Sequence, residues 1–573
     1  MNDAVTTESP AQEAPQVDSQ ALEQAIARGA AAVKREQRPD GSWDDDTDLG
    51  PSATAMHWIA EAAIGGASPE AGADAAAYLL SQQQADGSFL PFPEAAAGTA
   101  SATALCRAGL LACGLPKTHP GVQKALEFID AQGGHDAVAD LLRSRGDLTP
   151  LFLVSAGVLD GSRLPPLPPE LALTPFDRLV DRKMHAGNVV IALVLCALVA
   201  KFGRTPPSSF LAKAARKVEN QRIQYTLFQW QNDAGDWNGQ CNYTWLILVG
   251  LAATGLDRSD ERVARAMAWL AGKRRVTATG SAYNSMGTDV WSTSFAALAL
   301  HAAGEPFQGE VMSAARRHLL AAQCKRPMPR VNQRKSDAVR TGGWGFQRGN
   351  ETMPDCDDTG VVLATLCEVS AGNATREIFV ATEHGVSWLR DMQNPDGGFA
   401  SYVWNQPTKK PGPMYLVDIP LTLDDPGRIL SFLTNPPAEF SDPALEGVTG
   451  RALWGLGACG VKRDDPLVCS AIEFLRSQQC GNGAWWGRWM TCYLVETATT
   501  LLGLAAVGED MHTGYVESAV RFLCKSQNAD GGFGERHEAY RDPRLAGQGP
   551  SMPPVTGFVL AGLLAARPKL DDF

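Results

Sequence analysis

The sequence lacks several features that mark common functional classes. Its 573 residues contain no Cys-x-x-Cys pair and no run of basic residues, and the formal net charge is −12. This charge argues against a nucleic-acid partner, which needs a basic surface. The 12 cysteines have no paired spacing and no signal peptide precedes them. They therefore indicate free thiols in a reducing cytoplasm.

Long apolar runs are also absent. The longest one, "VVIALVLCALVA" at Val189–Ala200, is too short to cross a bilayer and predicts a buried core helix instead. The first 20 residues are polar and contain proline, so we predict a disordered tail there. The remaining length, with 45 % hydrophobic residues overall, is enough for two or three domains.

One short pattern organises the chain. A glutamine is followed by glycine four residues later and by an aromatic residue six residues later. The six copies begin at Gln37, Gln83, Gln231, Gln393, Gln479 and Gln527, and their aromatic residues are Trp43, Phe89, Trp237, Phe399, Trp485 and Phe533. Weaker copies begin at Gln132 and Gln323.

Each copy separates two apolar segments of helical periodicity, and its glycine suits a turn that ends a helix. Helical hairpins repeated in this way stack into an open solenoid or a closed α/α barrel. A glutamine that caps a helix end while the aromatic ring stacks on it would connect neighbouring turns, so we assign both residues mainly to stability.

The segment "MPDCDDTGVV" crowds Asp355, Asp357 and Asp358 directly before an apolar run. One interpretation is helix capping, because carboxylates bind the free N–H groups of a first turn. The other is chemical. Neighbouring carboxylates cannot all ionise cheaply, so one keeps its proton, and the helix N-terminus makes that proton easier to give up. The titration would belong to the cluster.

The repeats resemble the QW motifs of the squalene–hopene cyclase family, the class II terpene cyclases. The segment "GGWGFQRGNETMPDCDDTGVVLATL" is similar to the family's catalytic segment with its DxDDT motif. "GAWWGRWMTCYLVETATTLLGL" and "QNADGGFGERHEAYRDPRLAGQGPSMPPVTG" resemble later blocks of the family. The resemblance extends from about Leu22 to the C-terminus.

The resemblance implies an all-α fold. Two α/α barrels would enclose a central apolar cavity, and one barrel would be inserted into the other. On this basis we expect a disordered tail over 1–20, an N-terminal helix over 21–36 that packs on the catalytic barrel, an inserted barrel over 37–280 and the catalytic barrel over 281–573.

The resemblance also implies the chemistry. Asp357, the middle acid, would protonate a terminal alkene of a linear polyprene, a neutral squalene-like isoprenoid, and cyclisation would follow through carbocations. Asp355 and Asp358 would support Asp357, and Thr359 would cap the helix. No metal or redox cofactor is implied. Aromatic faces stabilise cations without reacting with them, and the aromatic residues that match the family's motifs are Phe346, Trp291, Tyr402 and Trp489. For each, ordinary core packing is the alternative.

The sequence departs from the family at Arg451 in "EGVTGRALWGL", where the family places a histidine. A guanidinium there would hold Asp355 or Asp358 ionised and leave Asp357 with the proton, although it cannot relay protons as histidine does. An exposed surface arginine is the alternative. The short segment "RTPPSSFLAKAARKVENQRIQYT" leaves peripheral (monotopic) membrane contact on the cytoplasmic face open, and a homodimer is open as well.

Three other functions are compatible with parts of the pattern. A class II cyclase of a prenyl diphosphate would need Mg²⁺, which the acidic run Asp44, Asp45, Asp46 and Asp48 could bind; a solvated loop is the alternative for that run. A protein prenyltransferase β-subunit would bind zinc through Asp, Cys and His. A helical toroid without enzymatic activity would be favoured if the acid cluster were exposed to solvent.

Overall fold

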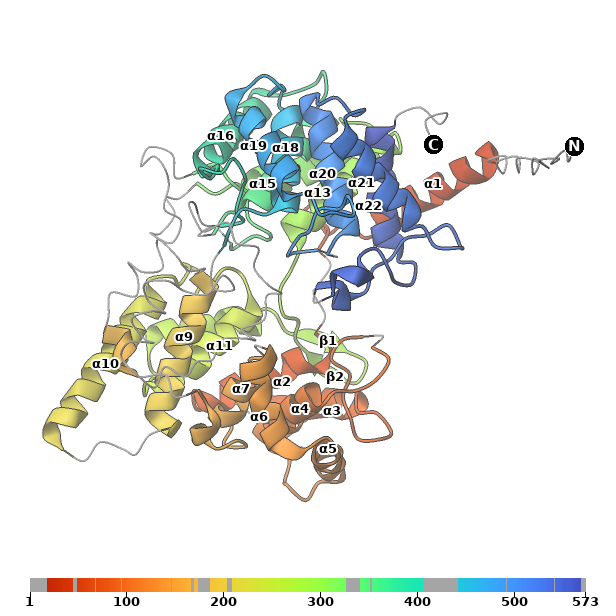
Figure 1. The fold of residues 1–573 in the computed structure, drawn as a ribbon. Coiled ribbons are helices and arrows are strands. Elements are labelled where there is room, and N and C mark those ends of the chain that lie inside the picture. Colours follow the sequence, from red (N-terminus) through yellow and green to blue (C-terminus); the bar gives the residue numbers. More distant parts are fainter. Residues whose placement is uncertain are drawn as a thin grey trace, which may run out of the picture.

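The computed structural model shows two helical lobes (Figure 1). It describes residues 18–44, 49–66, 69–93, 95–145, 147–165, 169–173, 186–203, 209–325, 341–350, 353–402, 404, 442–490, 492–540 and 542–567. Most of the predicted N-terminal tail lies outside these residues, and helix α1 (Ser19–Arg35) includes the last two residues of that tail.

The first lobe is the lower one in Figure 1. Its helices are α2 (Pro51–Ala63), α3 (Pro69–Ser81), α4 (Ala100–Ala112), α5 (Pro120–Ala131), α6 (Gly134–Arg145), α7 (Thr149–Ser155), α9 (Ala186–Leu198), α10 (Phe210–Phe228), α11 (Cys241–Ala253) and α12 (Glu261–Ala271). Short turns of helix lie at η1 (Gly161–Arg163), η2 (Pro169–Leu173) and η3 (Val199–Gly203). A two-stranded antiparallel hairpin, β1 (Arg275–Thr277) and β2 (Gly280–Ala282), pairs Val276 with Ser281.

The second lobe contains α1 and the helices after the hairpin. These are α13 (Asp289–Ala302), α14 (Glu310–Ala322), α15 (Cys356–Val369), α16 (Arg376–Met392), α18 (Glu446–Ala458), α19 (Pro466–Gln478), α20 (Leu494–Val507), α21 (Gly514–Lys525) and α22 (Pro553–Ala566). Two short 3₁₀ turns, η5 (His537–Tyr540) and η6 (Pro543–Leu545), precede α22. The all-α architecture predicted from the sequence is therefore confirmed.

Each lobe has its own large hydrophobic core. One consists of buried residues between Ala53 and Tyr283, and the other of buried residues between Val290 and Ala566. The predicted buried helix is part of the first core, since Val189 and Val194 of α9 have no exposed surface. Among the described residues, no helix is both long and apolar enough to cross a membrane.

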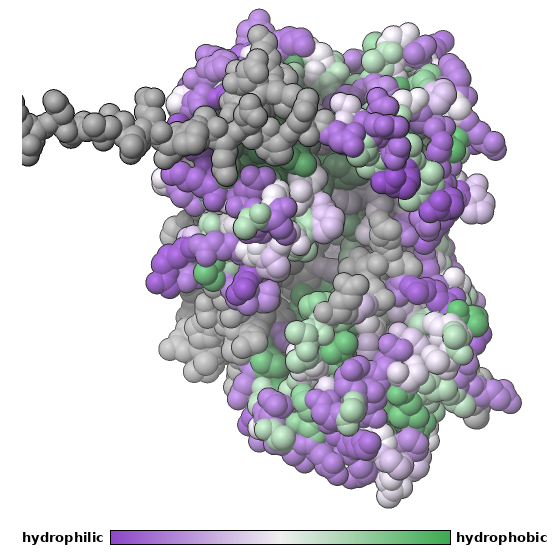
Figure 2. Space-filling view, turned by 90° about the vertical axis from the view of Figure 1, so that its right-hand side faces the viewer, coloured by the Kyte–Doolittle hydropathy of each residue, from purple (hydrophilic) through white to green (hydrophobic). Residues whose placement is uncertain are grey.

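The space-filling view shows a face that is hollowed between the two lobes (Figure 2). The outer surfaces of both lobes on this face are mainly hydrophilic, whereas hydrophobic and weakly polar residues are visible toward the hollow. The enclosed apolar cavity that we expect between the barrels stays a prediction.

The repeated turns join each outer helix to the next. In the copy at Gln393, the side-chain amide donates 2.8 Å hydrogen bonds to the carbonyls of Gly397 and Leu467, and Leu467 is the second residue of α19. The same two kinds of bond are formed by Gln37, Gln83, Gln231 and Gln479. Gln393 and Gln479 are the C-cap residues of α16 and α19, and their amides connect these helix ends to the next outer helix, which agrees with the expected role of the glutamines.

The two weak copies have different outcomes. Gln323 forms both bonds, to the carbonyls of Gly342 and Ala381. Its glycine lies much farther along the chain than in the other copies, which hides the spacing in the sequence. Gln132 follows α5 as its C-cap residue, and α6 begins two residues later, so this stretch links two helices directly.

The aromatic residue of each copy bonds an inner helix through its backbone N–H, and the tryptophans also bond the preceding outer helix through the indole. The indole N–H of Trp485 donates to the carbonyl of Leu475 in the preceding outer helix, and its backbone N–H donates to the hydroxyl of Thr497 in the following inner helix. An equivalent threonine accepts the backbone N–H of Trp43, Phe89, Trp237, Trp344, Phe399 and Phe533. Each turn therefore fixes three helices.

The first copy of the repeat contacts the second lobe. The Gln37 amide bonds the carbonyl of Val311 in α14, and Trp43 bonds Thr293 in α13. At the other boundary, Tyr283 belongs to the core of the first lobe. We therefore propose that the inserted barrel begins after Trp43 and ends after Tyr283, a few residues later at both ends than the expected limits of 37 and 280.

The glycines of the repeat provide a test of this packing. We predict that Gly397→Ala destabilises the chain more than Gly531→Ala. Both glycines have positive φ, +90° and +84°, so both variants carry similar backbone strain. However, a Cβ at Gly397 would lie 2.2 Å from the carbonyl oxygen of Ser470 in α19, whereas nothing lies within 4 Å of one at Gly531.

The extra loss should be about 1–3 kcal/mol, as for other overpacked sites. Urea unfolding followed by circular dichroism measures it, with Gly531→Ala as the matched control. Equal losses in the two variants would contradict the proposed contact between the turn and α19.

Candidate active site

The three acids of the DxDD segment lie at the start of α15. Asp355 is the N-cap residue, and its carboxylate accepts the backbone N–H of Asp358 at 2.7 Å. Asp357 and Asp358 lie in the first turn, and the three residues are only 2 %, 8 % and 3 % exposed in sequence order. The capping interpretation therefore explains Asp355, but it leaves two further buried carboxyls unexplained.

Thr359 has a different role from the predicted one. Its hydroxyl accepts the backbone N–H of Trp344 at 2.9 Å, which is the contact that threonines make in the other repeats. The prediction that Thr359 caps the helix is wrong because Asp355 already occupies that position. The repeat architecture consequently fixes where the acids lie relative to the turn before them.

Arg451, in α18, is fully buried and directly bonded to the acid cluster. Its Nε donates to one oxygen of Asp357, and its Nη2 donates to the other at 3.2 Å. Its Nη1 donates to Glu496 at 2.9 Å and to the hydroxyl of Thr499 at 3.1 Å. The exposed-arginine alternative is thereby excluded.

The partner of Arg451 differs from our expectation. We expected the guanidinium to hold Asp355 or Asp358 ionised, but it forms its two-pronged ion pair with Asp357. Because α18 packs against α15 at the level of Gly360, the first-turn side chain on that face is the one that meets Arg451. Asp357 is therefore the member of the DxDD cluster that bonds the guanidinium through both of its carboxylate oxygens.

The other two acids favour their protonated forms. Burial raises the pKa of Asp355 to about 7, and the nearby charges of Asp357 and Asp442 add to the effect. Burial and the charges of Asp355 and Asp357 raise the pKa of Asp358 well above its ordinary value, although Arg451 opposes this shift. The Asp355–Asp358 pair consequently retains a proton near neutral pH.

Two further buried acids belong to the site, and the sequence reasoning missed both. Asp442 has no exposed surface and accepts the backbone N–H groups of Ser401 and Tyr402. Glu496, in α20, is 1 % exposed and binds Arg451. Both are single acids within apolar sequence contexts, so no local motif could have identified them.

The four predicted aromatic residues form two contact pairs. The rings of Tyr402 and Trp489 meet edge to face at 5.9 Å, and the Trp489 indole donates to the hydroxyl of Ser401. Burial and the charges of Asp355 and Asp358 raise the pKa of Tyr402 well above its ordinary range, which places this pair beside the acids.

The second pair joins Trp291 of α13 to Phe346. Their ring centroids are 6.0 Å apart, and the backbone N–H of Trp291 donates to the carbonyl of Phe346. The ring of Trp291 also meets that of Phe295 at 5.0 Å. Phe346 lies on the segment that leads into the acids, so this pair borders the same site.

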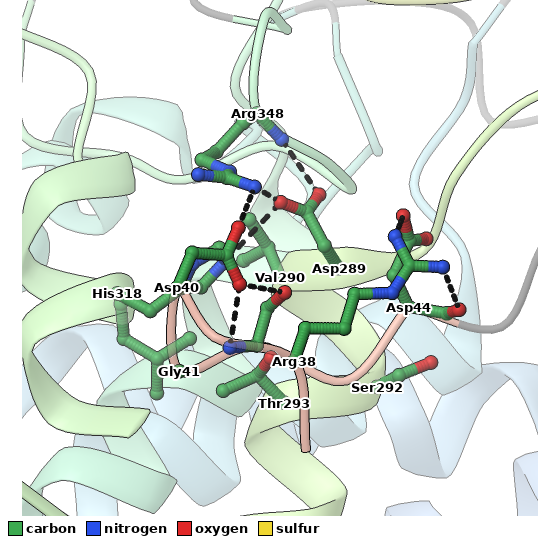
Figure 3. A network of polar contacts seen from close by, with 12 residues as sticks. Arg38, Asp40, Gly41, Asp44, Asp289, Val290, Ser292, Thr293, His318 and Arg348 are labelled. Carbon is green, nitrogen blue, oxygen red and sulfur yellow. Dashed lines mark hydrogen bonds and ion pairs between the residues drawn. The ribbon is translucent and has the colours of Figure 1, made fainter. Parts of the chain in front are cut away.

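The segment that contains Phe346 and Arg348 is held at the N-terminus of α13 by ion pairs and hydrogen bonds (Figure 3). The carboxylate of Asp289 accepts the backbone N–H of Arg348 at 2.9 Å and its Nε at 2.6 Å, and Nη2 of Arg348 pairs with Asp40. The imidazole Nε2 of the buried His318 lies 3.2 Å from the same carboxylate. Burial by itself would raise the pKa of Asp289. The bonds with His318 and Arg348 together have the larger effect, so the pKa of Asp289 is lowered. These contacts hold Phe346 in place beside Trp291.

The segment also contacts the first lobe. The Asn232 amide donates to the carbonyl of Gly349 at 2.7 Å, and the Gln347 amide donates to the carbonyl of Asn238 at 3.1 Å. Asn238 in turn lies 3.1 Å from the sulfur of Met353. The acids therefore lie on the side of the second lobe that meets the first.

The acidic run proposed as a magnesium site is only partly described. Both oxygens of Asp44 are engaged by the protein, one by the backbone N–H of Thr288 and one by Arg38. Asp45, Asp46 and Asp48 lie outside the described residues. Asp44 thus has a structural role that accounts for its position (Figure 3).

Comparison with known proteins identifies the family. A model described as the squalene–hopene cyclase C-terminal domain matches residues 288–571, and one described as the N-terminal domain of the same enzymes matches residues 26–212. The chain belongs to the squalene–hopene cyclase family. Its α/α-barrel architecture and its repeated turns are the features expected of that family.

Individual relatives of the squalene–hopene cyclase family are distant. Enfumafungin synthase of Hormonema carpetanum is 26 % identical over 94 % of this chain and 44 % of its own length. The squalene–hopene cyclase of Alicyclobacillus acidocaldarius is 26 % identical over 85 % of this chain and 79 % of its own length. The chain thus spans less than half of the first of these relatives. The solved ent-copalyl diphosphate synthase from Streptomyces platensis aligns with a TM-score of 0.47 and 16 % identity, over 95 % of this chain and 92 % of that one.

The raised pKa of Asp355 predicts a pH-dependent stability for this member of the squalene–hopene cyclase family. The pKa of Asp355 is about 7 in the folded state, against an ordinary value of 3.8. Between pH 3.8 and about pH 7, the folded state therefore holds a proton on Asp355 that the unfolded state has lost. The stabilisation is complete below about pH 4 and is lost as pH rises through the folded pKa. Asp355→Asn keeps an N-cap acceptor and should remove a slope of up to about 1.4 kcal/mol per pH unit.

Urea unfolding at a series of pH values measures this slope. Asp465 is a matched control, because it caps α19 while its bond with Arg390 lowers its pKa. Asp465→Asn should leave the dependence between about pH 5 and 7 unchanged. An unchanged slope in Asp355→Asn would mean that the Asp355 carboxyl is ionised throughout this range.

Proposed function

We propose that the chain is a class II terpene cyclase, which protonates the terminal alkene of a neutral, squalene-like polyprene and cyclises it through carbocations. The observation that carries the proposal is the buried cluster of Asp355, Asp357 and Asp358 at the start of α15. An unactivated alkene is a very weak base, so its protonation requires a strong acid that is kept from bulk water. Relatives named for squalene support this substrate class.

We further propose that the acids divide the work. The Asp355–Asp358 pair stores the proton, because burial and mutual repulsion favour its protonated form. Asp357 delivers the proton, since it is the most exposed of the three at 8 %. A proton on Asp357 is given up readily because its departure restores the ion pair with Arg451 and leaves an anion at a helix N-terminus.

Glu496 and Thr499 support this role of Arg451. They bond the side of the guanidinium that does not face Asp357, and so they orient it toward the acid. A histidine in the same place would lose and regain its own proton, whereas the guanidinium stays charged. In this chain Arg451 therefore acts as a fixed positive charge, and the Asp355–Asp358 pair takes over the storage of the proton.

The aromatic pairs suit the cations that follow protonation. Aromatic faces attract a cation without taking its proton or bonding to it. Tyr402 and Trp489 lie beside the acids, where the first cation forms. Trp291 and Phe346 lie along the clamped segment, where we propose that they stabilise positive charge further along the substrate.

The first prediction from this proposal concerns Asp357. Asp357→Asn should reduce cyclisation by at least about 100-fold, because the amide has no proton acidic enough to transfer. Asp358→Asn should reduce it as well, since the stored proton is lost. The assay is incubation with squalene followed by mass spectrometry of the cyclic products, and circular dichroism checks that the variants fold.

The wild-type rate should also fall as pH rises above about 7, because Asp355 loses its proton there and the charge of the cluster increases. Asp464→Asn, an exposed acid on the same lobe, is the control and should keep the full rate. Normal turnover by Asp357→Asn would remove the central claim of the proposal.

The second prediction concerns metal. A neutral polyprene has no diphosphate for Mg²⁺ to bind, so EDTA should leave the rate of squalene cyclisation unchanged. The same assay with geranylgeranyl diphosphate tests the alternative substrate class. Loss of activity in EDTA that Mg²⁺ restores would favour a diphosphate substrate and a metal site involving Asp44 and its neighbouring acids.

We also propose that the chain reaches its substrate at a membrane surface without crossing it. Polyprenes of this size partition into lipid, and the first lobe exposes large apolar side chains on and near α10. Phe210 is 84 % exposed and Tyr225 is 56 % exposed. Such side chains suit a shallow insertion into the interfacial region of a bilayer.

A further inference from the structure

The helices that carry Asp357 and Arg451 are packed backbone to backbone. A Cβ at Gly360 of α15 would lie 2.4 Å from the carbonyl oxygen of Arg451, and one at Gly455 of α18 would lie 2.3 Å from that of Gly360. Only glycines allow this approach. The contact therefore lies in the second turn of α15, directly after the acid cluster, and in the part of α18 that contains Arg451.

At the opposite ends of the same helices, two cysteines meet. Cys367 lies in the last turn of α15, and Cys459 is the C-cap residue of α18. Their sulfur atoms are 2.8 Å apart, within hydrogen-bond contact of one thiol with the other. Both side chains are partly exposed, whereas seven other cysteines of the chain are buried.

The pair is open to reagents from solution. Cys459 contributes to a surface pocket that is also lined by Glu383, Val386, Arg390, Gly460, Val461, Lys462, Asp464 and Asp465. The hydrogen bond from Cys459 lowers the pKa of Cys367, and the same contact raises that of Cys459. Cys367 therefore ionises more readily than Cys459. It is the better nucleophile of the two, because thiolates and not thiols attack disulfides.

We propose that Cys367 and Cys459 form a redox-active dithiol that closes to a disulfide by exchange with a small-molecule disulfide. The Cys367 thiolate attacks the reagent and releases one thiol, and Cys459 then attacks the Cys367 sulfur and releases the second. The two protein thiols together lose two protons and two electrons, and the reagent disulfide takes them up and is reduced to two thiols. This site does not depend on the proposed cyclase activity.

The disulfide would add a covalent connection between α15 and α18, beside the glycine contact, the Asp357–Arg451 ion pair and the hydrogen bond from Trp454 to Glu368. It would link positions 92 residues apart, and so restrict the unfolded chain strongly. The oxidised chain should therefore unfold at a higher temperature than the reduced one.

The experiment uses the full-length reduced chain and oxidised glutathione as the reagent. After incubation, free thiols are alkylated and the digest is analysed by mass spectrometry. We expect a peptide pair joined through Cys367 and Cys459, and a rise in the melting temperature that dithiothreitol reverses. In Cys459→Ser, glutathione should stay attached to Cys367 and the melting temperature should not rise.

Cys469 and Cys524 serve as internal controls because they are exposed and should carry glutathione or remain free. A Cys469→Ser/Cys524→Ser background removes exchange with these thiols and should keep the internal bond. Recovery of Cys367 and Cys459 as two alkylated thiols, or as two separate glutathione adducts, would overturn the proposal.

Discussion

The hydrogen bonds of the repeated glutamine turn are the interaction on which this architecture depends. The amide spans from its own turn to the next outer helix, as Gln393 does to Leu467. The backbone N–H of the aromatic residue bonds forward to an inner helix, and a tryptophan at this position also bonds backward to the outer helix, as Trp485 does. Buried polar groups are costly unless they are paired, and the turn pairs several of them at once. Because Thr359 is one of these forward anchors, the same rule that builds the barrel sets the position of the acids.

The electrostatics of the site follow from an imbalance of charge. Asp355, Asp357, Asp358 and Glu496 are buried around Arg451, which bonds Asp357 and Glu496. One guanidinium cannot neutralise all of these carboxylates, so some must keep a proton. The raised pKa values of Asp355 and Asp358 are consistent with this imbalance.

Helices α15 and α18 form a closely packed pair that carries both the acid cluster and the two adjacent thiols. The glycine contact lies next to the acids at the start of α15 and to Arg451 in the middle of α18, and the C-terminal ends of both helices hold two adjacent thiols. The clamp between Asp289 and Arg348 fixes the segment before α15 in the same way. The geometry of a functional site depends on such support, because the position of a side chain can be no more precise than that of the backbone that carries it.

The sequence by itself determined the helical class, the repeated turns and the place of the acids before an apolar helix, since these depend on local periodicity and spacing. It also identified Arg451 as an unusual residue beside them. Only the tertiary structure decided that Arg451 binds Asp357, that Asp442 and Glu496 complete the cluster, and that Cys367 meets Cys459. These contacts join residues tens of positions apart. Their existence depends on how closely helices approach, and here that distance is set by glycines whose effect appears only once the helices have packed.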